Sequence, residues 1–227
     1  MARLAAHSRW PNDIEVWHID IPNELAEWSS LELRLNEDEK LRAARYRHDS
    51  DRLRFAVTRA SLRTLLAART GDPEYALQFS LGPCGKPTLN GYPQVSFNVT
   101  HSGPHALIAM SNARRVGIDV QVVDPSIRWR ELLDIVCTDD ERQALVSSSK
   151  DSQPQLFFRC WTAKEALLKL TGVGITEGLQ SVSVNLFASG AQRLRNQPNE
   201  NTQATSFFQF HWIAEIDDCV GCIAFEA

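Results

Sequence analysis

Three residues spaced four apart, Trp161, Glu165 and Lys169, carry the side chains best suited to chemistry in this 227-residue chain. Residues four apart lie on one stripe of an α-helix, so the spacing predicts that these side chains point the same way. A carboxylate and an ammonium group one turn apart could hold a metal ion and a phosphate together. The same spacing also fits an ordinary Glu–Lys pair on a helix surface, which stabilises a helix only slightly.

The stretch Leu156–Ile175 is predicted to form the helix that carries these residues, ending in a glycine loop. Pro154 just before the helix and Gly172 just after it are the expected boundary signals. A second stripe at i, i+3, i+4 and i+7 is apolar and is expected to face the core; it contains Ala163, Ala166, Leu167 and Leu170. The reactive stripe should therefore lie at the edge of a buried helix face.

A second carboxylate, that of Asp119, falls inside a predicted strand. Apolar residues alternate over Val95–Val99, fill Ala106–Met110 and alternate again over Val116–Val122, which predicts three short strands separated by turns. Strands disfavour aspartate, and burial of its charge is costly unless the group is paired or binds a metal. Because the apolar residues of the third strand are expected to face the core, Asp119 should point the other way, toward either solvent or a cleft.

Together these stretches resemble the signatures of the 4′-phosphopantetheinyl transferases, of the larger type that activates surfactin synthetase (Sfp type). The resemblance is carried by Val116–Asp119 (VGID) and Trp161–Lys169 (WTAKEALLK), with Gly85–Pro87 (GKP) and Phe97–Ser102 (FNVTHS) in corresponding places. It covers the chain from about Leu35 to its end. It implies an α+β fold made of a pseudo-twofold pair of similar halves, residues 1–113 and 114–227, with the active site in the cleft between them.

The resemblance also implies a reaction. The enzyme, a holo-[acyl-carrier-protein] synthase, would transfer the 4′-phosphopantetheine group of coenzyme A to a serine of an apo acyl or peptidyl carrier protein, using Mg²⁺ and releasing 3′,5′-ADP. Asp119 and Glu165 would hold Mg²⁺ on the diphosphate, Glu165 would take the serine proton, and Lys169 would stabilise the leaving group. Many members have a metal-binding glutamate two residues after the aspartate. Here that residue is Gln121, whose amide oxygen can bind a metal or a metal-bound water but brings no charge.

Residues that bind coenzyme A are implied in the same way. Arg42 and Arg54 would face the 3′-phosphate, because the planar fork of arginine can hold two phosphate oxygens. The other phosphate contacts implied are Lys86, Thr100, His101 and Lys164. Without the resemblance, a basic helix face is usually solvated, a Gly-Lys-Pro is an ordinary turn, and an isolated histidine is more often structural.

Hydrophobic periodicity and boundary signals predict the remaining elements. Helices are expected over 37–48, 52–69, 129–136 and 138–147, of which the first and last begin with capping motifs at Asn36-x-x-Glu39 and Thr138-x-x-Glu141. Strands are expected over 14–21, 77–81, 181–187, 207–216 and 220–225. The polar stretch 189–205 is expected to be a surface loop.

Composition limits the possible classes of function. The net charge of −4 argues against bulk electrostatic binding of nucleic acid, and no apolar run approaches the ~20 residues that would span a bilayer. The N-terminus lacks the hydrophobic segment of a secretory signal, and five scattered cysteines are typical of a reduced cytosolic protein. We therefore expect a cytoplasmic protein, and the resemblance adds that it is a monomer. The lone CxxC, Cys219 to Cys222, has no second pair, so metal or redox use is not expected of it.

Three other functions remain open at this point. A non-catalytic protein that binds coenzyme A or a nucleotide would bind without incorporation. A metal-dependent phosphohydrolase using the same carboxylates would release phosphate without any carrier protein. A scaffold whose charged helices only mediate contacts would show no metal dependence.

Overall fold

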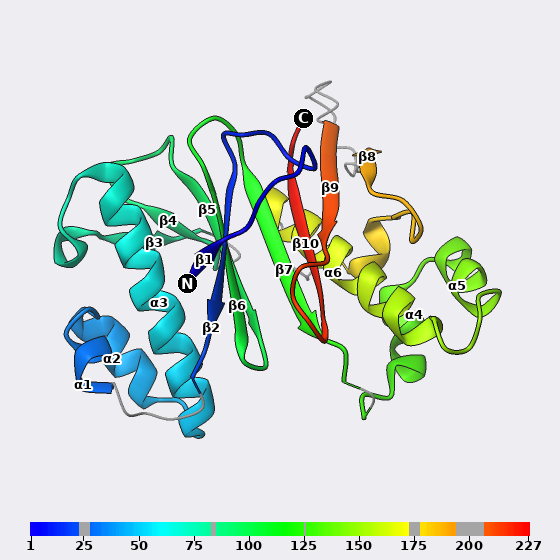
Figure 1. The fold of residues 1–227 in the computed structure, drawn as a ribbon, viewed down its shortest axis with the longest axis horizontal. Helices are drawn as coiled ribbons and strands as arrows, with labels where there is room; N and C mark the ends of the chain where they lie inside the picture. Colours follow the sequence, from blue (N-terminus) through cyan, green and yellow to red (C-terminus); the bar gives the residue numbers. More distant parts are fainter. Residues whose placement is uncertain (23–27, 83–84, 125, 173–177, 194–206) are drawn as a thin grey trace.

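Two antiparallel sheets, each carrying one long helix, form the body of the protein (Figure 1). The computed structural model describes all residues except 23–27, 83–84, 125, 173–177 and 194–206. The predicted α+β class is confirmed. Residues 112–115 form the loop between the strand His105–Ser111 of one sheet and the strand Val116–Val122 of the other. The resemblance implies a division between the halves at this loop.

The N-terminal sheet has the strand order β1 (Ala2–Arg3), β2 (Glu15–Asp20), β6 (His105–Ser111) and β5 (Ser96–Ser102). Helix α3 (Asp49–Thr70) packs on one face through a core that includes Leu62, Leu66 and Ile108. The helix ends at Gly71, whose φ of 82° is the left-handed conformation that glycine adopts without strain. The strand expected over 14–21 and the helix expected over 52–69 are therefore confirmed, with α3 beginning three residues earlier.

Short elements complete this half. Helix α1 (Trp28–Glu32) is followed by α2 (Glu37–Ala44), which begins with the expected capping box. It ends before the predicted His48, because the chain turns there to start α3. A 3-10 turn, η1 (Glu74–Ala76), then leads to the hairpin of β3 (Phe79–Leu81) and β4 (Pro87–Leu89).

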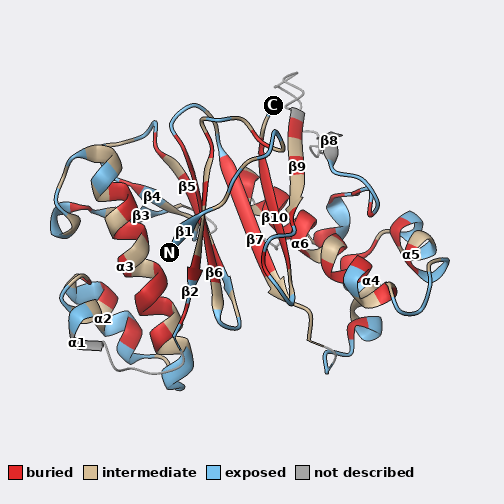
Figure 2. Ribbon diagram, viewed as in Figure 1, coloured by how far each residue is buried: buried red, intermediate tan, exposed pale blue. Residues whose placement is uncertain are grey.

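The C-terminal sheet has the strand order β7 (Val116–Val122), β10 (Cys219–Glu226), β9 (Phe207–Ile213) and β8 (Gly190–Arg193). Helix α6 (Gln153–Thr171) packs on it, and its predicted core stripe is buried: Ala163, Ala166, Leu167 and Leu170 are at most 1% exposed. The central strands and α6 form the most buried region (Figure 2). The strands expected over 207–216 and 220–225 are confirmed.

The start of α6 differs from the prediction. Pro154 lies in the first turn of the helix rather than before it. Proline is tolerated there because its missing N–H would have no partner within the helix. At the other end Gly172 stops the helix in the left-handed conformation, with φ of 74°. The predicted stop at Gly172 is therefore confirmed, and residues 173–175 of the predicted glycine loop lie outside the described part of the chain.

Along the chain, the segment between β7 and β8 contains, besides α6, the short helices η2 (Trp129–Leu132), α4 (Leu133–Val136), α5 (Asp139–Val146) and η4 (Leu179–Ser181).

The prediction of a strand over 181–187 is wrong. Val182, Val184 and Leu186 are buried in alternation with exposed neighbours, but they do not join a sheet. The backbone N–H of Val184 donates instead to the carboxylate of Glu141, at 2.7 Å. Part of the loop expected over 189–205 forms β8, and residues 194–205 lie outside the described part of the chain.

The sheets meet along β5 and β7 without a backbone ladder. Side chains of β5 accept hydrogen bonds from backbone N–H groups of β7: Ser96 from Val116 at 3.1 Å, Asn98 from Ile118 at 2.8 Å, and Ser102 from Val122 at 3.0 Å. We call these three bonds the polar seam. Thr100 occupies the remaining position of the series and donates its hydroxyl to the side chain of Asp119, at 2.9 Å. The predicted carboxylate thus lies at the junction of the two sheets.

Candidate active site

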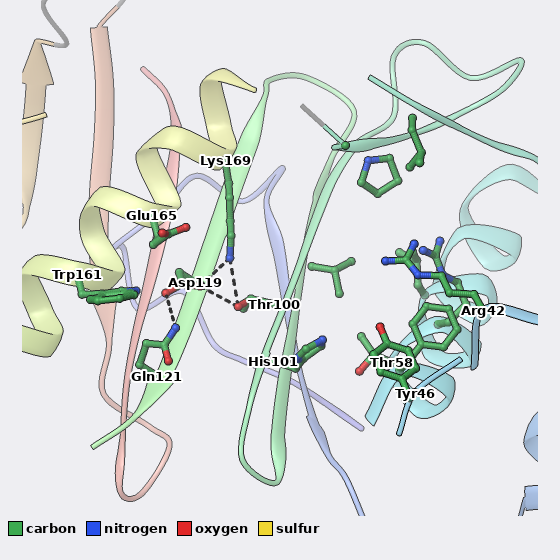
Figure 3. Close-up of a pocket in the computed structure, with 17 residues that line it drawn as sticks. Arg42, Tyr46, Thr58, Thr100, His101, Asp119, Gln121, Trp161, Glu165 and Lys169 are labelled. Carbon is green, nitrogen blue, oxygen red and sulfur yellow. Dashed lines mark hydrogen bonds and ion pairs between the residues drawn. The ribbon is translucent and has the colours of Figure 1, made fainter. Parts of the chain in front are cut away.

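A cavity of about 510 Å³ lies between the two halves (Figure 3). One wall consists of residues from α2, α3 and the β3–β4 hairpin, and the opposite wall consists of residues from β7 and α6. Trp161, Glu165 and Lys169 all line it, as the spacing of four predicts. Predicted site residues from the other elements that also line it are Arg42, Thr100, His101, Asp119 and Gln121.

Asp119 is the most buried acidic group of the cavity, with 1% of the residue exposed. It lies on the α6 side of β7, because the alternate residues Val116, Ile118 and Val120 pack into the core between the sheets. Its Oδ1 atom lies 2.6 Å from Nζ of Lys169 and accepts the hydroxyl of Thr100. The cost of burying this charge is therefore offset by an ion pair and a hydrogen bond.

Glu165 lies on α6, one turn before Lys169, and is 5% exposed. Burial raises the pKa of its carboxyl group; the positive charge of Lys169 lowers the pKa and the negative charge of Asp119 raises it. Lys169 forms its ion pair not with Glu165 but with Asp119 on the neighbouring strand β7, at 2.6 Å. The ordinary interpretation as a solvated Glu–Lys surface pair therefore does not describe these residues.

The donor set at this end of the cavity fits a hard divalent cation. Asp119 and Glu165 offer carboxylate oxygens, the ligands that Mg²⁺ prefers. Gln121 lies beside them, but its amide nitrogen points to Oδ2 of Asp119 at 3.4 Å, and its oxygen accepts from Ser102 at 3.4 Å. Both contacts are long, and a half-turn of the amide would present the oxygen instead. Gln121 can thus supply an oxygen ligand without a backbone change.

The opposite end of the cavity is basic and aromatic. Arg42 and Arg59 line it, and both guanidinium groups lie near the ring of Phe55, at 5.2 and 5.8 Å. Arg59 also pairs with Glu39 at 3.5 Å, and burial lowers the pKa of its guanidinium. Tyr46 and Thr58 complete this wall (Figure 3). Arg59 was not singled out by the sequence analysis, although its spacing of four from Phe55 on α3 is the signal that could have found it.

Arg54 lies outside this lining among the described residues. Its Nη1 atom pairs with Asp51 at 2.6 Å and its Nε donates to the carbonyl of Gly103 at 3.0 Å. It nevertheless influences the cavity, because burial and the charge of Arg54 both lower the pKa of His101. The structure therefore brings Arg42, but not Arg54, to the cavity wall.

Lys86 is not directed into the large cavity, whereas its neighbours Gly85 and Pro87 line it. Its ammonium donates to the carbonyls of Val116 at 3.1 Å and Lys169 at 2.8 Å. Carbonyls at the C-terminus of a helix attract cations, so Lys86 ties the β3–β4 hairpin to the end of α6. Burial lowers its pKa to about 8. The predicted phosphate contact is thus replaced in this structure by contacts with backbone carbonyls.

Lys164 also differs from the prediction. It is fully buried on the far side of α6, 2.5 Å from Glu141, and it donates to the carbonyl of Val136 at 2.7 Å. Consecutive residues on a helix point about 100° apart, so Lys164 cannot follow Glu165 into the cavity. It is a core ion pair rather than a phosphate ligand.

Replacing Lys164 by alanine is expected to lower the free energy of unfolding by about 3–5 kcal/mol, because the carboxylate of Glu141 would stay buried without its counter-charge. Urea denaturation measures the loss, and the exposed Lys150→Ala serves as the matched control, with a change within about 0.5 kcal/mol. If Lys164 contacted a phosphate instead, the variant would raise the KM for coenzyme A and leave the free energy of unfolding unchanged.

The remaining cysteine and membrane predictions concern regions away from the cavity. Cys219 and Cys222 are free thiols on β10, and Cys222 is buried. Within the described residues, no helix has the length and apolar character needed to span a lipid bilayer.

Comparison with known proteins matches both halves of the chain. The model of the 4′-phosphopantetheinyl transferase superfamily matches residues 115–224, and the model of the 4′-phosphopantetheinyl transferase N-terminal region matches residues 22–113. These two matches meet at the loop between β6 and β7.

Individual relatives agree with this result. HetI, a 4′-phosphopantetheinyl transferase of Nostoc, is 29% identical over 216 residues, which cover 94% of this chain and 87% of HetI. Sfp of Bacillus subtilis is 26% identical over 156 residues, covering 69% of this chain and 68% of Sfp. A Synechocystis protein named as a candidate 4′-phosphopantetheinyl transferase is 39% identical over 150 residues, covering 65% of this chain and 61% of that protein. On these matches, and on the cavity that both halves line, the chain belongs to the 4′-phosphopantetheinyl transferase superfamily.

Proposed function

We propose that this transferase moves the 4′-phosphopantetheine group of coenzyme A to a serine of an apo acyl or peptidyl carrier protein, with Mg²⁺, and releases 3′,5′-ADP. The observation that carries the proposal is the convergence of Asp119, Glu165 and Lys169 on one cavity from a strand and a helix far apart in sequence. The names of HetI and Sfp as 4′-phosphopantetheinyl transferases support the same activity. We further propose that the protein acts in the cytoplasm as a monomer of two halves, residues 1–113 and 114–227.

The distribution of charged residues in the cavity lining suits an extended, multiply charged substrate. Arg42 and Arg59 supply two guanidinium groups at one end, where a terminal phosphate would be held through paired N–H donors. Thr100 and His101 lie between that end and the acidic pair and can donate hydrogen bonds to a diphosphate. Arg54, whose charge lowers the pKa of His101, adds positive charge near that histidine. In this arrangement the diphosphate lies next to Asp119 and Glu165.

Different side chains of the protein have different roles in the proposed transfer. Glu165 takes the proton of the carrier serine, and burial, which raises its pKa, makes it a stronger base than an exposed glutamate. The serine oxygen forms a bond to the β-phosphorus of coenzyme A, and the bond between this phosphorus and the bridging oxygen breaks. That oxygen leaves with the electron pair as part of 3′,5′-ADP, while Lys169, fixed by Asp119, supplies positive charge beside the diphosphate. Mg²⁺ held by Asp119 and Glu165, with Gln121 or water completing the set, would neutralise negative charge on the diphosphate.

Intact-mass spectrometry tests the proposal. The protein is incubated with coenzyme A, Mg²⁺ and several apo carrier proteins, and the expected result is a carrier heavier by one phosphopantetheine arm. A control carrier with alanine in place of the acceptor serine should stay unmodified. Binding of coenzyme A without modification of any carrier would favour the non-catalytic alternative, and phosphate release without a carrier would favour a phosphohydrolase.

Replacing Gln121 by glutamate is expected to retain carrier modification, within about tenfold of the wild type. The new carboxylate has the size of the amide and lies where a third oxygen ligand is useful. We expect the variant to need less Mg²⁺ for half-maximal rate, because a charged ligand binds the cation more tightly. A loss as large as that of an Asp119 variant would contradict the role proposed for residue 121.

A further inference from the structure

A group of side chains of types that can bind a metal ion lies on the N-terminal sheet, outside the lining of the candidate active site. His18 and Asp20 belong to β2, and His105 is the first residue of β6. The two strands are antiparallel neighbours in which Asp20 pairs with His105 and His18 pairs with Leu107. Because strand residues alternate, the three side chains share the face that carries Val16, opposite the face packed on α3.

The three donor atoms are close enough to share one ion. Nε2 of His18 lies 3.0 Å from Nδ1 of His105, and Oδ1 of Asp20 lies 3.6 Å and 3.9 Å from these two nitrogens. Ligand atoms around a tetrahedral zinc ion with bonds of about 2.0–2.1 Å are separated by about 3.3 Å. The separations observed on the sheet bracket this value. The triangle therefore needs side-chain adjustment of only a few tenths of an ångström to bind.

We propose that His18, Asp20 and His105 form a binding site for a divalent transition-metal ion of the zinc type. Two imidazoles and one carboxylate are the ligand set that such ions select, whereas Mg²⁺ prefers oxygen ligands alone. The site is therefore distinct in chemistry as well as in place from the acidic pair of Asp119 and Glu165.

The surroundings favour metal binding over protonation. The two histidine side chains are 16% and 18% exposed, so the sheet fixes them, while that of Asp20 is 80% exposed and leaves an open approach for an ion. Burial lowers the pKa of His18, and a neutral imidazole is the form that binds a metal. Placement on adjacent paired strands gives a rigid base for the ligands.

The competing explanation is a hydrogen bond between the two rings, in which one imidazole donates to the other. It accounts for the distance of 3.0 Å but gives Asp20 no defined role and predicts no metal binding. The two explanations differ in a measurable way.

Calorimetric titration of the full chain with Zn²⁺ tests the site. A large excess of Mg²⁺ and the background variant Asp119→Asn/Glu165→Gln keep zinc from the acidic pair, and a reductant that does not bind zinc keeps the thiols reduced. We expect one Zn²⁺ per chain with a Kd on the order of 1 µM. Co²⁺ in place of Zn²⁺ should give the visible absorption of a site with nitrogen and oxygen ligands.

Three variants complete the test. His105→Gln and His18→Gln should weaken zinc binding at least tenfold, and the exposed Asp20→Asn, which cannot disturb the core, should weaken it severalfold. His7→Asn, which removes an exposed histidine outside the cluster, is the matched control and should bind as the wild type does. Equal affinity in the wild type and in both histidine variants, or no zinc bound by the wild type, would overturn the proposal.

Discussion

Replacing Glu165 by glutamine should lower carrier modification by about 10³-fold or more, while the protein remains folded. Glutamine has nearly the same volume as glutamate, so the packing of α6 should not change. It removes the general base, which is worth about 10²–10⁴ in rate, and it removes one of the two anionic ligands proposed for Mg²⁺. The rate of incorporation of phosphopantetheine, measured by intact mass at saturating coenzyme A, gives the loss directly.

Asp119→Asn should show a loss of similar size, because it removes the other anionic ligand and the partner that fixes Lys169 at 2.6 Å. Glu131→Gln, on the surface of the same half, is the matched control and should retain the wild-type rate. Circular dichroism and urea denaturation establish that the variants are folded. Near-normal turnover by both Glu165→Gln and Asp119→Asn would refute the roles proposed for these two carboxylates.

Replacing Gly117 by alanine is expected to destabilise the protein strongly. A Cβ atom at this position would overlap the carbonyl oxygen of Ala166 and lie 2.5 Å from the backbone nitrogen of Leu170. These are backbone atoms of α6, so no side-chain rotation relieves the clash and the helix must move away from β7. Overpacking a core usually costs about 1–3 kcal/mol, and we expect about 3 kcal/mol or more here because the backbone is involved.

The same variant should lose activity even at temperatures where it is folded. Asp119 lies two residues beyond Gly117 on β7, and Glu165 directly precedes Ala166 on α6, so separating the strand from the helix separates the two carboxylates. Gly221→Ala on the neighbouring strand β10 is the matched control, because its Cβ would meet only side-chain atoms, the nearest at 3.1 Å. Urea denaturation and carrier modification are measured for both variants. Equal stability of Gly117→Ala and the wild type would show that α6 is not packed on β7 in this way.

The parts of the site that follow from periodicity were predictable from sequence. A spacing of four places Trp161, Glu165 and Lys169 in one cavity, and the alternation in β7 puts Asp119 opposite the core face. Helical phase also separates Lys164 from its neighbour Glu165, so its direction away from the cavity could have been derived from the same spacing.

Other features depend on contacts that sequence spacing does not specify. Lys86 is long enough to reach several acceptors, and only the fold places its ammonium on the carbonyls at the end of α6. The choice between Arg54 and Arg59 rests on which face of α3 meets the cavity. The alternation over 181–187 reflects burial of every second side chain, which a segment can achieve without pairing in a sheet.

The polar seam has a consequence for motion of the two halves. Its hydrogen bonds join side chains of β5 to backbone groups of β7, so each can break singly while the ladders within both sheets stay intact. Each such bond contributes only about 0.5–1.5 kcal/mol net, and water can replace the broken partner. Opening the seam locally, with the apolar core between the sheets kept packed, would therefore cost less than breaking a backbone ladder within either sheet. In the proposed reaction, such local opening at this boundary would give the nucleotide product a way out while the strand and helix that carry the two carboxylates stay in place.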